Sequence, residues 1–338
     1  MFKSCDPSTS ATLVDEKFLR EEERDSIVCF SHLRWNFVFQ RPQQIMTRLA
    51  RSYDVLFWEE PGGDEKGSAR IEEYRDGSGV TVIVPHLPKG LARDEQTAHL
   101  RTLLNRRLAG IEGHLVRWYY TPMMLPFSRH LNSAYCVYDC MDELSAFDFA
   151  PAELPWLERE LFGVADVVFT GGYSLYEAKQ AHHGNVQPFP SSVDQHHFAT
   201  ARQLVPANNA RPRIGFYGVI DERFDIALLR QIAALRPEID FEIVGPVVKI
   251  DSAALPRADN IFYTGPVPYE DLPQCLGRWH AAMMPFALNE STRFISPTKT
   301  PEYLAAGLPV VSTPIRDVVR PYGDEGLVHI VSSAEEFG

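Results

Sequence analysis

The stretch S-P-T-K-T-P-E-Y-L-A-A-G-L-P-V-V-S-T, residues 296–313, predicts a loop, a helix of about three turns and a strand in immediate succession. Ser296 suits the N-cap of this helix, and Pro297 suits its first position. Gly307, followed two residues later by a proline, marks the end of the helix before the apolar strand 310–312. The free N–H groups and the dipole of such a helix make its start a site for anions.

Two charged side chains of this stretch, Lys299 and Glu302, are three residues apart and therefore lie on one face of the predicted helix. The cation can neutralise a diphosphate, and the carboxylate can accept hydrogen bonds from two neighbouring ribose hydroxyls. The pair therefore suits a nucleotide. The alternative is a capped surface helix with one intrahelical ion pair, and the pattern alone does not decide between the two.

The same stretch resembles the donor-site signature S-P-x-K-x-x-E-Y-x-A-x-G-x-P-V-V of retaining glycosyltransferases with the GT-B fold, in the group known as family 4 or group 1. The resemblance implies that Glu302 binds the donor ribose and that Lys299 holds the diphosphate. Further donor contacts are expected from Ser296, Pro297 and Thr298. The resemblance also implies two doubly wound, Rossmann-like α/β domains that face each other across a cleft.

The chain departs from this pattern at two positions. Many relatives carry a glutamate eight positions before the ribose glutamate, where it touches the transferred sugar, but this chain has Phe294 there and Glu290 four residues earlier. Pro301 lies beyond the first turn of the predicted helix, where a proline removes a hydrogen bond and is expected to loosen or kink the segment.

Composition fits this class. The chain has 338 residues, of which 45% are hydrophobic and 23% charged, so it can form sizeable cores and two domains. It has no run of 18 apolar residues that would span a membrane. A net charge of −12 argues against nucleic acid as a partner, because affinity for phosphate backbones needs a basic surface. A few local cations still suffice for a small phosphorylated ligand.

The cysteines and the N-terminus predict that the protein is cytoplasmic. A location at the inner face of the membrane is the further option. Five cysteines, an odd number without paired metal spacing, are expected to be reduced thiols. Residues 1–25 are acidic and lack an apolar segment, so they predict a polar extension rather than a signal peptide.

Apolar runs alternate with helical patterns in both halves, which predicts parallel sheets covered by helices. Predicted strands lie at 26–31, 55–58, 80–84, 116–119, 136–138 and 167–170, and then at 213–217, 241–244, 261–263 and 281–286. The segment 187–213, rich in Pro, Asn and Ser, is interpreted as the connection. We expect an acceptor domain at 26–205 and a donor domain at 206–338, shortened at its C-terminal helices, with a ligand site in the cleft.

Two loops of the second half are expected to add donor contacts. After its first strand, Gly218 permits close backbone approach, Val219 follows it, and Arg223 can reach a phosphate. The alternative is a surface ion pair of this arginine with a neighbouring Asp or Glu. In the resembled family the loop after the strand 261–263 borders the nucleotide base, so Val267 and Tyr269 are predicted to form its wall. Tyr269 packed at a helix start is the alternative.

The stretch S-H-L-R-W-N-F-V-F-Q-R-P-Q-Q, residues 31–44, follows the first strand of the N-terminal half and is predicted to bind the acceptor. Its cations, aromatic surface and amides suit sugars and phosphates. The acceptor-binding candidates are His32, Arg34, Trp35, Gln40 and Arg41. The two arginines can instead hold the loop through backbone carbonyls. The stretch resembles the opening motif R-W-x-F-x-x-Q-R-P-Q of glycosyltransferases of bacterial cell-surface polysaccharide synthesis, which extends the resemblance over both halves.

Asp139 and Asp142 follow another predicted strand, where the sheet opens into the cleft. Asp142 is the better candidate for contact with a reacting hydroxyl, whereas Asp139 is expected to fix the loop. Retaining enzymes of this fold are thought to need no dedicated base, so Asp142, Arg223 and Lys299 are the predicted catalytic residues, with the two cations stabilising the leaving diphosphate. No metal constellation or cofactor motif is found.

The stretch 89–111 is amphipathic, with five apolar side chains on one face and several arginines nearby. Most such helices cover a sheet, and the alternative is transient contact with an anionic membrane, which suits a lipid-linked acceptor. The sequence as a whole predicts a glycosyltransferase that takes a nucleotide-sugar donor and a glycan or lipid-linked acceptor. A nucleotide-sugar epimerase and an inactive nucleotide-sugar-binding scaffold are the alternatives.

Overall fold

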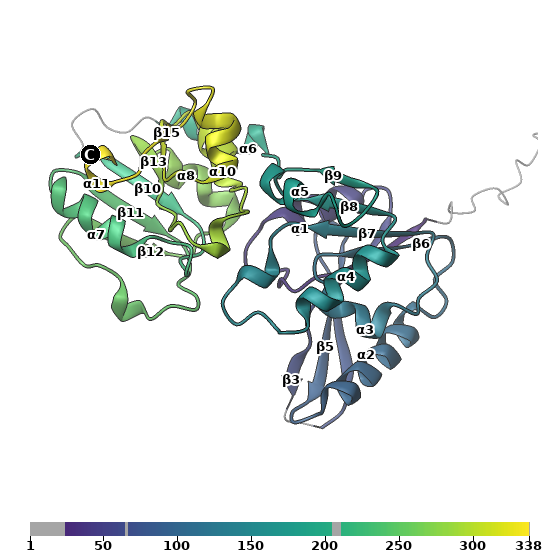
Figure 1. Ribbon diagram of the computed structural model, residues 1–338. Helices are drawn as coiled ribbons and strands as arrows, with labels where there is room; N and C mark the ends of the chain where they lie inside the picture. The colour runs from purple at the N-terminus through teal and green to yellow at the C-terminus, as the bar shows by residue number, and fades with distance from the viewer. Residues whose placement is uncertain (1–23, 65–66, 205–210, 338) are drawn as a thin grey trace, which may run out of the picture.

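The computed structural model describes residues 24–64, 67–204 and 211–337, which form two lobes (Figure 1). The N-terminal lobe is built on a nine-stranded sheet and the C-terminal lobe on a six-stranded sheet. Nearly all of the predicted N-terminal extension, 1–25, lies outside the described residues. The two sheets with helices confirm the predicted α/β class with two doubly wound domains.

The N-terminal sheet has the order β3-β5-β2-β1-β6-β7-β8-β9, with β4 antiparallel to β5 and all other pairs parallel. Every residue of β1 is buried, as expected for a central parallel strand with both faces covered. The strands are β1 (Ser26–Phe30), β2 (Asp54–Trp58), β3 (Gly62–Asp64), β4 (Arg70–Arg75), β5 (Thr81–Pro88), β6 (Leu115–Tyr119), β7 (Tyr135–Cys140), β8 (Val167–Thr170) and β9 (Val186–Pro188).

Two cores cover the two faces of this sheet, because successive side chains of a strand point to opposite sides. Val28 and Phe30 of β1 belong to one core, and Ile27 and Cys29 belong to the other. Helices α2, α3, α4 and α5 contribute to the first core and α1 to the second. The helices are α1 (Arg41–Leu49), α2 (Arg93–Leu108), α3 (Leu125–Ser128), α4 (Leu154–Val164) and α5 (Tyr173–Lys179).

The C-terminal sheet is parallel throughout, with the order β12-β11-β10-β13-β14-β15. Its strands are β10 (Arg213–Tyr217), β11 (Asp240–Val244), β12 (Ile261–Gly265), β13 (Ala281–Met284), β14 (Val310–Ser312) and β15 (His329–Ile330). Its helices are α6 (Gln195–Ala199), α7 (Ile226–Leu235), α8 (Leu272–Leu276), α9 (Lys299–Ala305), α10 (Arg316–Val318) and α11 (Ala334–Phe337). Phe198 and Ala201 lie in the core of this domain, although they precede the predicted boundary at 205/206.

The predicted strands of both halves are present, with shifted ends. The strand predicted at 281–286 ends at Met284, because Pro285 has no N–H to continue the ladder. The predicted amphipathic stretch forms α2, whose Leu100, Leu103 and Leu104 are buried in the N-terminal core. The apolar face of α2 therefore packs on the core of its own domain. In the described part of the chain, no helix is long and apolar enough to cross a bilayer.

The helix of the opening stretch is shorter than predicted. It begins at Lys299 with Thr298 as its N-cap, so the prediction of Ser296 as N-cap and Pro297 as first helical residue is wrong. This later start explains how Pro301 is accommodated. At the third helical position its missing N–H costs no intrahelical hydrogen bond, because the first four N–H groups of a helix have no partner within it. Helix α9 ends before Gly307, which has a φ of 81°.

Candidate functional site

A cavity of about 100 Å³ lies between the two domains, at the carboxyl ends of the strands of both sheets. Ligands of open parallel sheets bind at this edge. The N-terminal domain lines it with residues that follow β1, β7, β8 and β9, namely Gln40, Arg41, Met141, Asp142, Gly171 and Ser191. The C-terminal domain contributes Val219, Arg223, Phe286 and the run Ile295, Ser296, Pro297, Thr298 and Lys299. Predicted donor-side and acceptor-side residues thus meet in one cavity.

Lys299, at the start of α9, lies against the backbone of the loop that follows β10. A Cβ atom added to Gly218 would lie 2.3 Å from Lys299 Cε, and the φ of Gly218 is 142°, so this position requires glycine. The Lys299 Nζ lies 5.8 Å from the ring centroid of Phe216 and 6.0 Å from that of Tyr217. Burial lowers the pKa of the ammonium, which nearby Glu302 opposes. Within the described ranges this lysine makes no ion pair, so its charge is available to a ligand.

Arg223 lines the cavity beside Lys299, but it has a carboxylate partner. Its Nη2 lies 2.7 Å from Oδ2 of Asp221, and its Nε donates to the same carboxylate. The alternative expected from the sequence, a surface pair with Glu222 or Asp225, is replaced by this pair with Asp221. The guanidinium also lies 5.4 Å from the ring centroid of Phe147, which belongs to the opposite domain.

Asp142 faces these two cations from the N-terminal side of the cavity. Burial raises its pKa to about 6, and the charges of Arg223 and Arg41 oppose that shift. The carboxyl is therefore largely ionised at neutral pH and can accept a hydrogen bond from a ligand hydroxyl. This position agrees with the choice of Asp142 over Asp139 as the functional candidate.

Glu302 lies one turn after Lys299 on α9 and is buried behind the cavity rather than in its lining. Burial raises the pKa of its carboxyl to about 7, and a hydrogen bond from Tyr217 and the charge of Lys299 oppose the rise. The Tyr217 hydroxyl donates to Oε2 of Glu302. The predicted surface ion pair of Lys299 with Glu302 is not among the salt bridges of the described chain, so the two charges are near each other without contact.

Tyr269, predicted as a wall of the base site, is covered by side chains. Its ring is stacked on His197 at a centroid distance of 4.5 Å and lies 4.5 Å from the ring of Phe39. Its hydroxyl accepts a hydrogen bond of 3.0 Å from Nε2 of Gln44 on α1. The alternative of packing at a helix start therefore describes this residue better, and the packing joins the two domains. Val267 is partly buried against the C-terminal core.

Three of the predicted acceptor residues do not line the cavity. Trp35 is 6% exposed and packs edge-on against Phe57 in the core, so its ring cannot stack on a sugar. Arg34 donates to Glu59 at 2.8 Å and to the carbonyl oxygen of Glu60 at 2.7 Å, which is the loop-holding alternative. Burial lowers the pKa of His32 to about 4, so this imidazole is neutral. Trp35 and Arg34 are held by contacts within their own domain, and the acceptor-binding role of all three residues stays a prediction.

Gln40 and Arg41 do line the cavity, but Arg41 is held in place by its own domain. It is 4% exposed, its Nη2 lies 2.7 Å from Oδ1 of Asp139, and its Nη1 donates to the carbonyl oxygen of Phe189 at 2.6 Å. Asp139 is fully buried, and burial raises its pKa against the effect of Arg41. This ion pair fixes the loop, as expected for Asp139, and it shapes the cavity wall.

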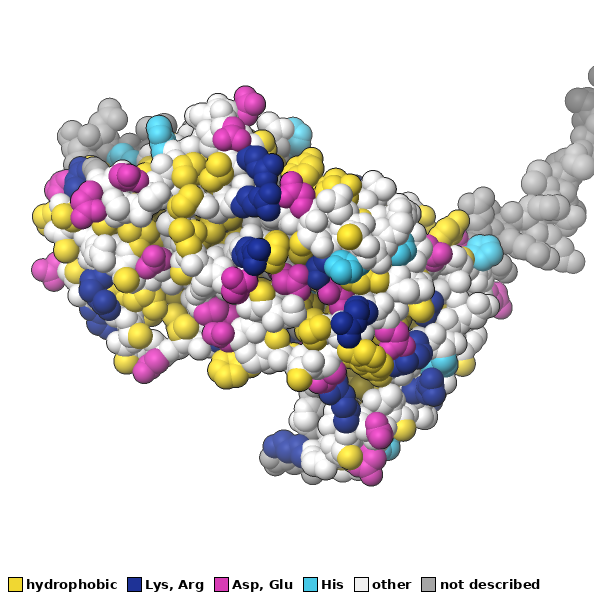
Figure 2. All heavy atoms as spheres, viewed as in Figure 1, with side chains coloured by type: hydrophobic (Ala, Val, Ile, Leu, Met, Phe, Trp, Pro, Cys, Tyr) yellow, Lys and Arg dark blue, Asp and Glu magenta, His cyan; other side chains and the backbone are white. Residues whose placement is uncertain are grey.

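Several residues that join the domains are not recognisable from sequence patterns. The backbone N–H of Ser174, at the start of α5, donates to Oδ1 of Asp317 at 3.0 Å, and Glu177 pairs with Arg316. A Cβ on Gly172 would lie 2.1 Å from Oδ2 of Asp317, so glycine allows this close contact. Figure 1 shows α10 beside α5 at the junction, and Figure 2 shows that charges of both signs meet there.

A larger hollow lies at the opposite edge of the N-terminal sheet, beside Ser26 and Asp54 at the amino ends of β1 and β2. That edge is not where parallel sheets bind ligands, and the hollow contains none of the candidate residues. Among the described residues, no group of three or more His, Cys, Asp or Glu side chains is arranged to hold a metal.

Two Rossmann-like domains that face each other across a cavity define the GT-B class, and comparison with solved structures agrees. Sucrose-phosphate synthase from Thermosynechococcus elongatus superposes with a TM-score of 0.70 at 15% identity, over 93% of this chain and 88% of that one. Anabaena HepE in complex with UDP and glucose gives a TM-score of 0.64 at 13% identity, over 92% and 86%. Likeness at this identity establishes the fold.

Residues 211–338 match the family described as Glycosyl transferases group 1. A segment of 103 residues is 30% identical to TuaH of Bacillus subtilis (strain 168), which is named as a teichuronic acid biosynthesis glycosyltransferase. That match spans 30% of this chain and about a quarter, 26%, of the relative. The chain therefore has the GT-B fold, and its C-terminal domain matches the group 1 glycosyltransferases, which confirms the predicted resemblance.

Proposed function

We propose that this protein is a glycosyltransferase that moves a hexose from a nucleoside diphosphate donor onto a glycan or lipid-linked acceptor, with retention and without a metal. The observation that carries the proposal is the position of Lys299. It lines the cavity beside Gly218, makes no ion pair in the described part of the chain, and precedes the buried Glu302 by one helical turn. A cation without an ion-pair partner, close to a carboxylate, suits a diphosphate and its ribose.

In the proposed reaction, the bond between the anomeric carbon and the phosphate oxygen breaks, and the acceptor oxygen forms a bond to that carbon. The acceptor proton passes to the departing diphosphate on the same face of the sugar, so no dedicated base is needed. Lys299 and Arg223 stabilise the negative charge that develops on the diphosphate. Asp142, across the cavity, accepts a hydrogen bond from a sugar hydroxyl and orients it.

On the acceptor side, we propose that Gln40, Asp142 and Ser191 contact the acceptor, because they line the cavity from the N-terminal domain. The similarity to TuaH over part of the chain favours an acceptor in polysaccharide synthesis. Four cysteines of the described chain, Cys29, Cys136, Cys140 and Cys275, are free and buried, which fits the reducing cytoplasm. Membrane contact through α2 is not part of the proposal.

The two alternatives have less support. An epimerase needs acid and base groups that converge on one sugar carbon, and among the residues that the structure describes Asp142 is the one carboxyl that lines the cavity. An inactive scaffold was suggested by Phe294 at the usual sugar-contact position. Phe294 is partly buried against the N-terminal core, so it belongs to the contact between the domains.

Calorimetric titration with UDP, GDP, dTDP and ADP tests the proposal, with UDP first because HepE and an Escherichia coli structure with UDP-2-fluoro glucose contain uridine nucleotides. We expect one nucleotide to bind, Lys299→Ala to weaken that binding at least about tenfold, and Glu302→Ala to abolish it. Arg230→Ala, which removes an exposed cation on α7 of the same domain, is the matched control and should bind normally. Folded wild-type protein that binds none of the four would overturn the proposal.

Product analysis with the corresponding nucleotide sugar separates the functions. Release of nucleoside diphosphate together with a glycosylated acceptor supports transfer with the predicted chemistry. An epimerised nucleotide sugar would support the first alternative, and an unchanged but bound donor would support the scaffold.

A further inference from the structure

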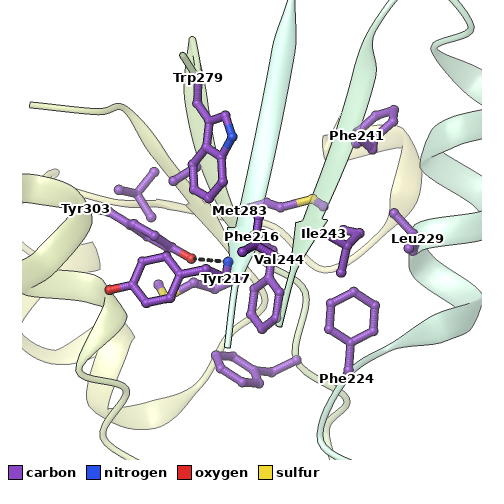
Figure 3. Close-up of a cluster of buried hydrophobic side chains, with 14 of the residues drawn as sticks. Phe216, Tyr217, Phe224, Leu229, Phe241, Ile243, Val244, Trp279, Met283 and Tyr303 are labelled. Atoms are coloured by element: carbon purple, nitrogen blue, oxygen red, sulfur yellow. Dashed lines mark hydrogen bonds between the residues drawn. The ribbon is translucent and has the colours of Figure 1, made fainter. Parts of the chain in front are cut away.

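Tyr217, the last residue of β10, is held from several sides in the core of the C-terminal domain. It is 8% exposed, and its backbone N–H donates to the Tyr303 hydroxyl at 3.0 Å, the dashed line in Figure 3. The Tyr217 and Tyr303 rings meet edge to face at 5.2 Å. On another side, the ring of Phe198 is parallel to that of Tyr217 at 6.5 Å. The Tyr217 ring therefore has one fixed position.

The hydroxyl of this fixed ring is directed at Glu302. It donates a hydrogen bond to Oε2 of that carboxylate. An ionised carboxylate offers about four lone-pair directions, so one hydroxyl donor leaves others for ribose hydroxyls. Since a glutamate side chain has three carbon–carbon torsions that can rotate, a hydrogen bond from a rigid donor selects one orientation of the Glu302 oxygens before any ligand arrives.

We infer that Tyr217 is a positioning residue for nucleoside recognition, which orients Glu302 toward the ribose hydroxyls through its own hydroxyl. The inference rests on the proposed function, in which Glu302 binds the donor ribose. Tyr217 touches neither the diphosphate nor the transferred sugar in this scheme. Tyr217 therefore contributes to binding of the ribose only, and its contribution can be measured separately from that of Lys299 to binding of the diphosphate.

The opposite role would be that of a competitor, in which the hydroxyl blocks Glu302 and must leave when a nucleotide binds. The packing argues against it. Displacing the hydroxyl requires the ring to turn away from Tyr303 and Phe198, although its backbone is anchored in the parallel sheet beside β11 and β13. Core side chains at this density do not turn without disturbing their neighbours.

The test compares wild type with Tyr217→Phe, which removes the hydroxyl and keeps the ring. Tyr263→Phe is the matched control, because its hydroxyl donates to the carbonyl oxygen of Pro256 and not to Glu302. Dissociation constants are measured calorimetrically for UDP, GDP and ADP, for their 2′-deoxy counterparts, and for pyrophosphate. Thermal unfolding of each variant establishes that the domain is intact.

We expect Tyr217→Phe to weaken binding of the preferred ribonucleotide about tenfold, as for loss of a hydrogen bond to a charged group. Its preference for the ribonucleotide over the 2′-deoxynucleotide should shrink, while pyrophosphate binding and the Tyr263→Phe control stay unchanged. The pH midpoint of nucleotide binding should move upward, since the tyrosine hydrogen bond lowers the pKa of Glu302. A purely structural role would move neither the ribose preference nor this midpoint.

Two outcomes would overturn the inference, and they differ in what else they overturn. Equal or tighter ribonucleotide binding by Tyr217→Phe, with binding still lost in Glu302→Ala, refutes the positioning role and leaves the proposed function intact. Nucleotide binding that is absent in wild type, or unchanged in Glu302→Ala, refutes the proposed function and this inference together.

Discussion

The two walls of the cavity use their positive charges differently. On the N-terminal side, Arg41 is buried and paired with Asp139, a carboxylate with no exposed surface. On the C-terminal side, Lys299 lines the cavity and makes no ion pair among the described residues. Gly218 leaves room for its side chain, because a Cβ there would collide with it. Arg41, which is buried together with its carboxylate partner, fixes the shape of its wall, whereas Lys299, which has no carboxylate partner in the described part of the chain, can bind a ligand's phosphate. Whether a cation has a carboxylate partner therefore says more about its role than its presence in the cavity wall does.

The largest expected effect is on stability, when the arginine of the N-terminal wall loses its carboxylate partner. Asp139→Ala leaves the Arg41 guanidinium buried without its partner and should lower the free energy of unfolding by about 3–5 kcal/mol. Urea denaturation measures it, with Glu177→Ala, which breaks an exposed pair, as the control. If the free energy of unfolding falls by less than about 1 kcal/mol, Arg41 is hydrated or bonded to another group in this variant. Arg41 would then again be a candidate for acceptor binding.

Lys299→Ala should behave in the opposite way. Nucleoside diphosphate affinity should fall by about 1.5–3 kcal/mol, the range for hydrogen bonds to charged groups, which is roughly 10- to 150-fold. Stability should stay the same or rise, because a desolvated cation without an ion pair does not favour the folded state. Titration calorimetry and urea denaturation of the same sample check both. A large loss of stability with unchanged affinity would reverse the roles given to the two walls.

The pH dependence of binding gives a smaller effect of known sign. Burial raises the pKa of Glu302 to about 7, and ribose hydroxyls are best accepted by the carboxylate. Affinity should therefore be constant above pH 8 and fall toward tenfold per unit below pH 7, about 1.4 kcal/mol per unit. Glu302→Gln is the control, because its affinity changes with pH only through titration of the nucleotide phosphate and of other groups. If wild type and this variant show the same dependence of affinity on pH, Glu302 is not the titrating group.

The smallest expected effect is that of Arg34→Ala. This arginine is 42% exposed and pairs with Glu59, and exposed ion pairs contribute about 0.2–1 kcal/mol. Stability should change by less than about 1 kcal/mol, and nucleotide affinity should remain within roughly twofold of wild type. A selective loss of acceptor use in product assays would show that Arg34 binds the acceptor after all.

The sequence predicted the C-terminal wall better than the N-terminal wall, for a physical reason. Lys299 and Glu302 are linked by helical spacing, and Gly218 by a turn after a strand, so local rules place all three. The role of Arg41 depends on its ion pair with Asp139, which is 98 residues away in the sequence, and no local pattern reveals that pair. Trp35 is likewise buried by Phe57 of the neighbouring strand.

The fold was more predictable than the site, because it depends on patterns repeated along the chain. Apolar runs bounded by turn residues gave the order of strands in both halves, even where their ends shifted. The start of α9 was misplaced because Ser296 and Pro297 satisfy the local rules for a cap. Ser296 instead lies close to Gly172 of the other domain, a contact that a sequence pattern cannot show, and α9 begins only at Lys299.

The size of the cavity has a consequence for every affinity measured on this protein. Sites for ligands of this class usually measure about 300–1,000 Å³, several times the space between these domains. Under the proposed function a donor needs more room than this, so contacts between the domains, such as that of Ser174 with Asp317, would have to open. The apparent dissociation constant then equals the intrinsic constant divided by the fraction of molecules in the open arrangement. Substitutions at Gly172 or Asp317 would act on that fraction, and so on affinity, without touching the donor.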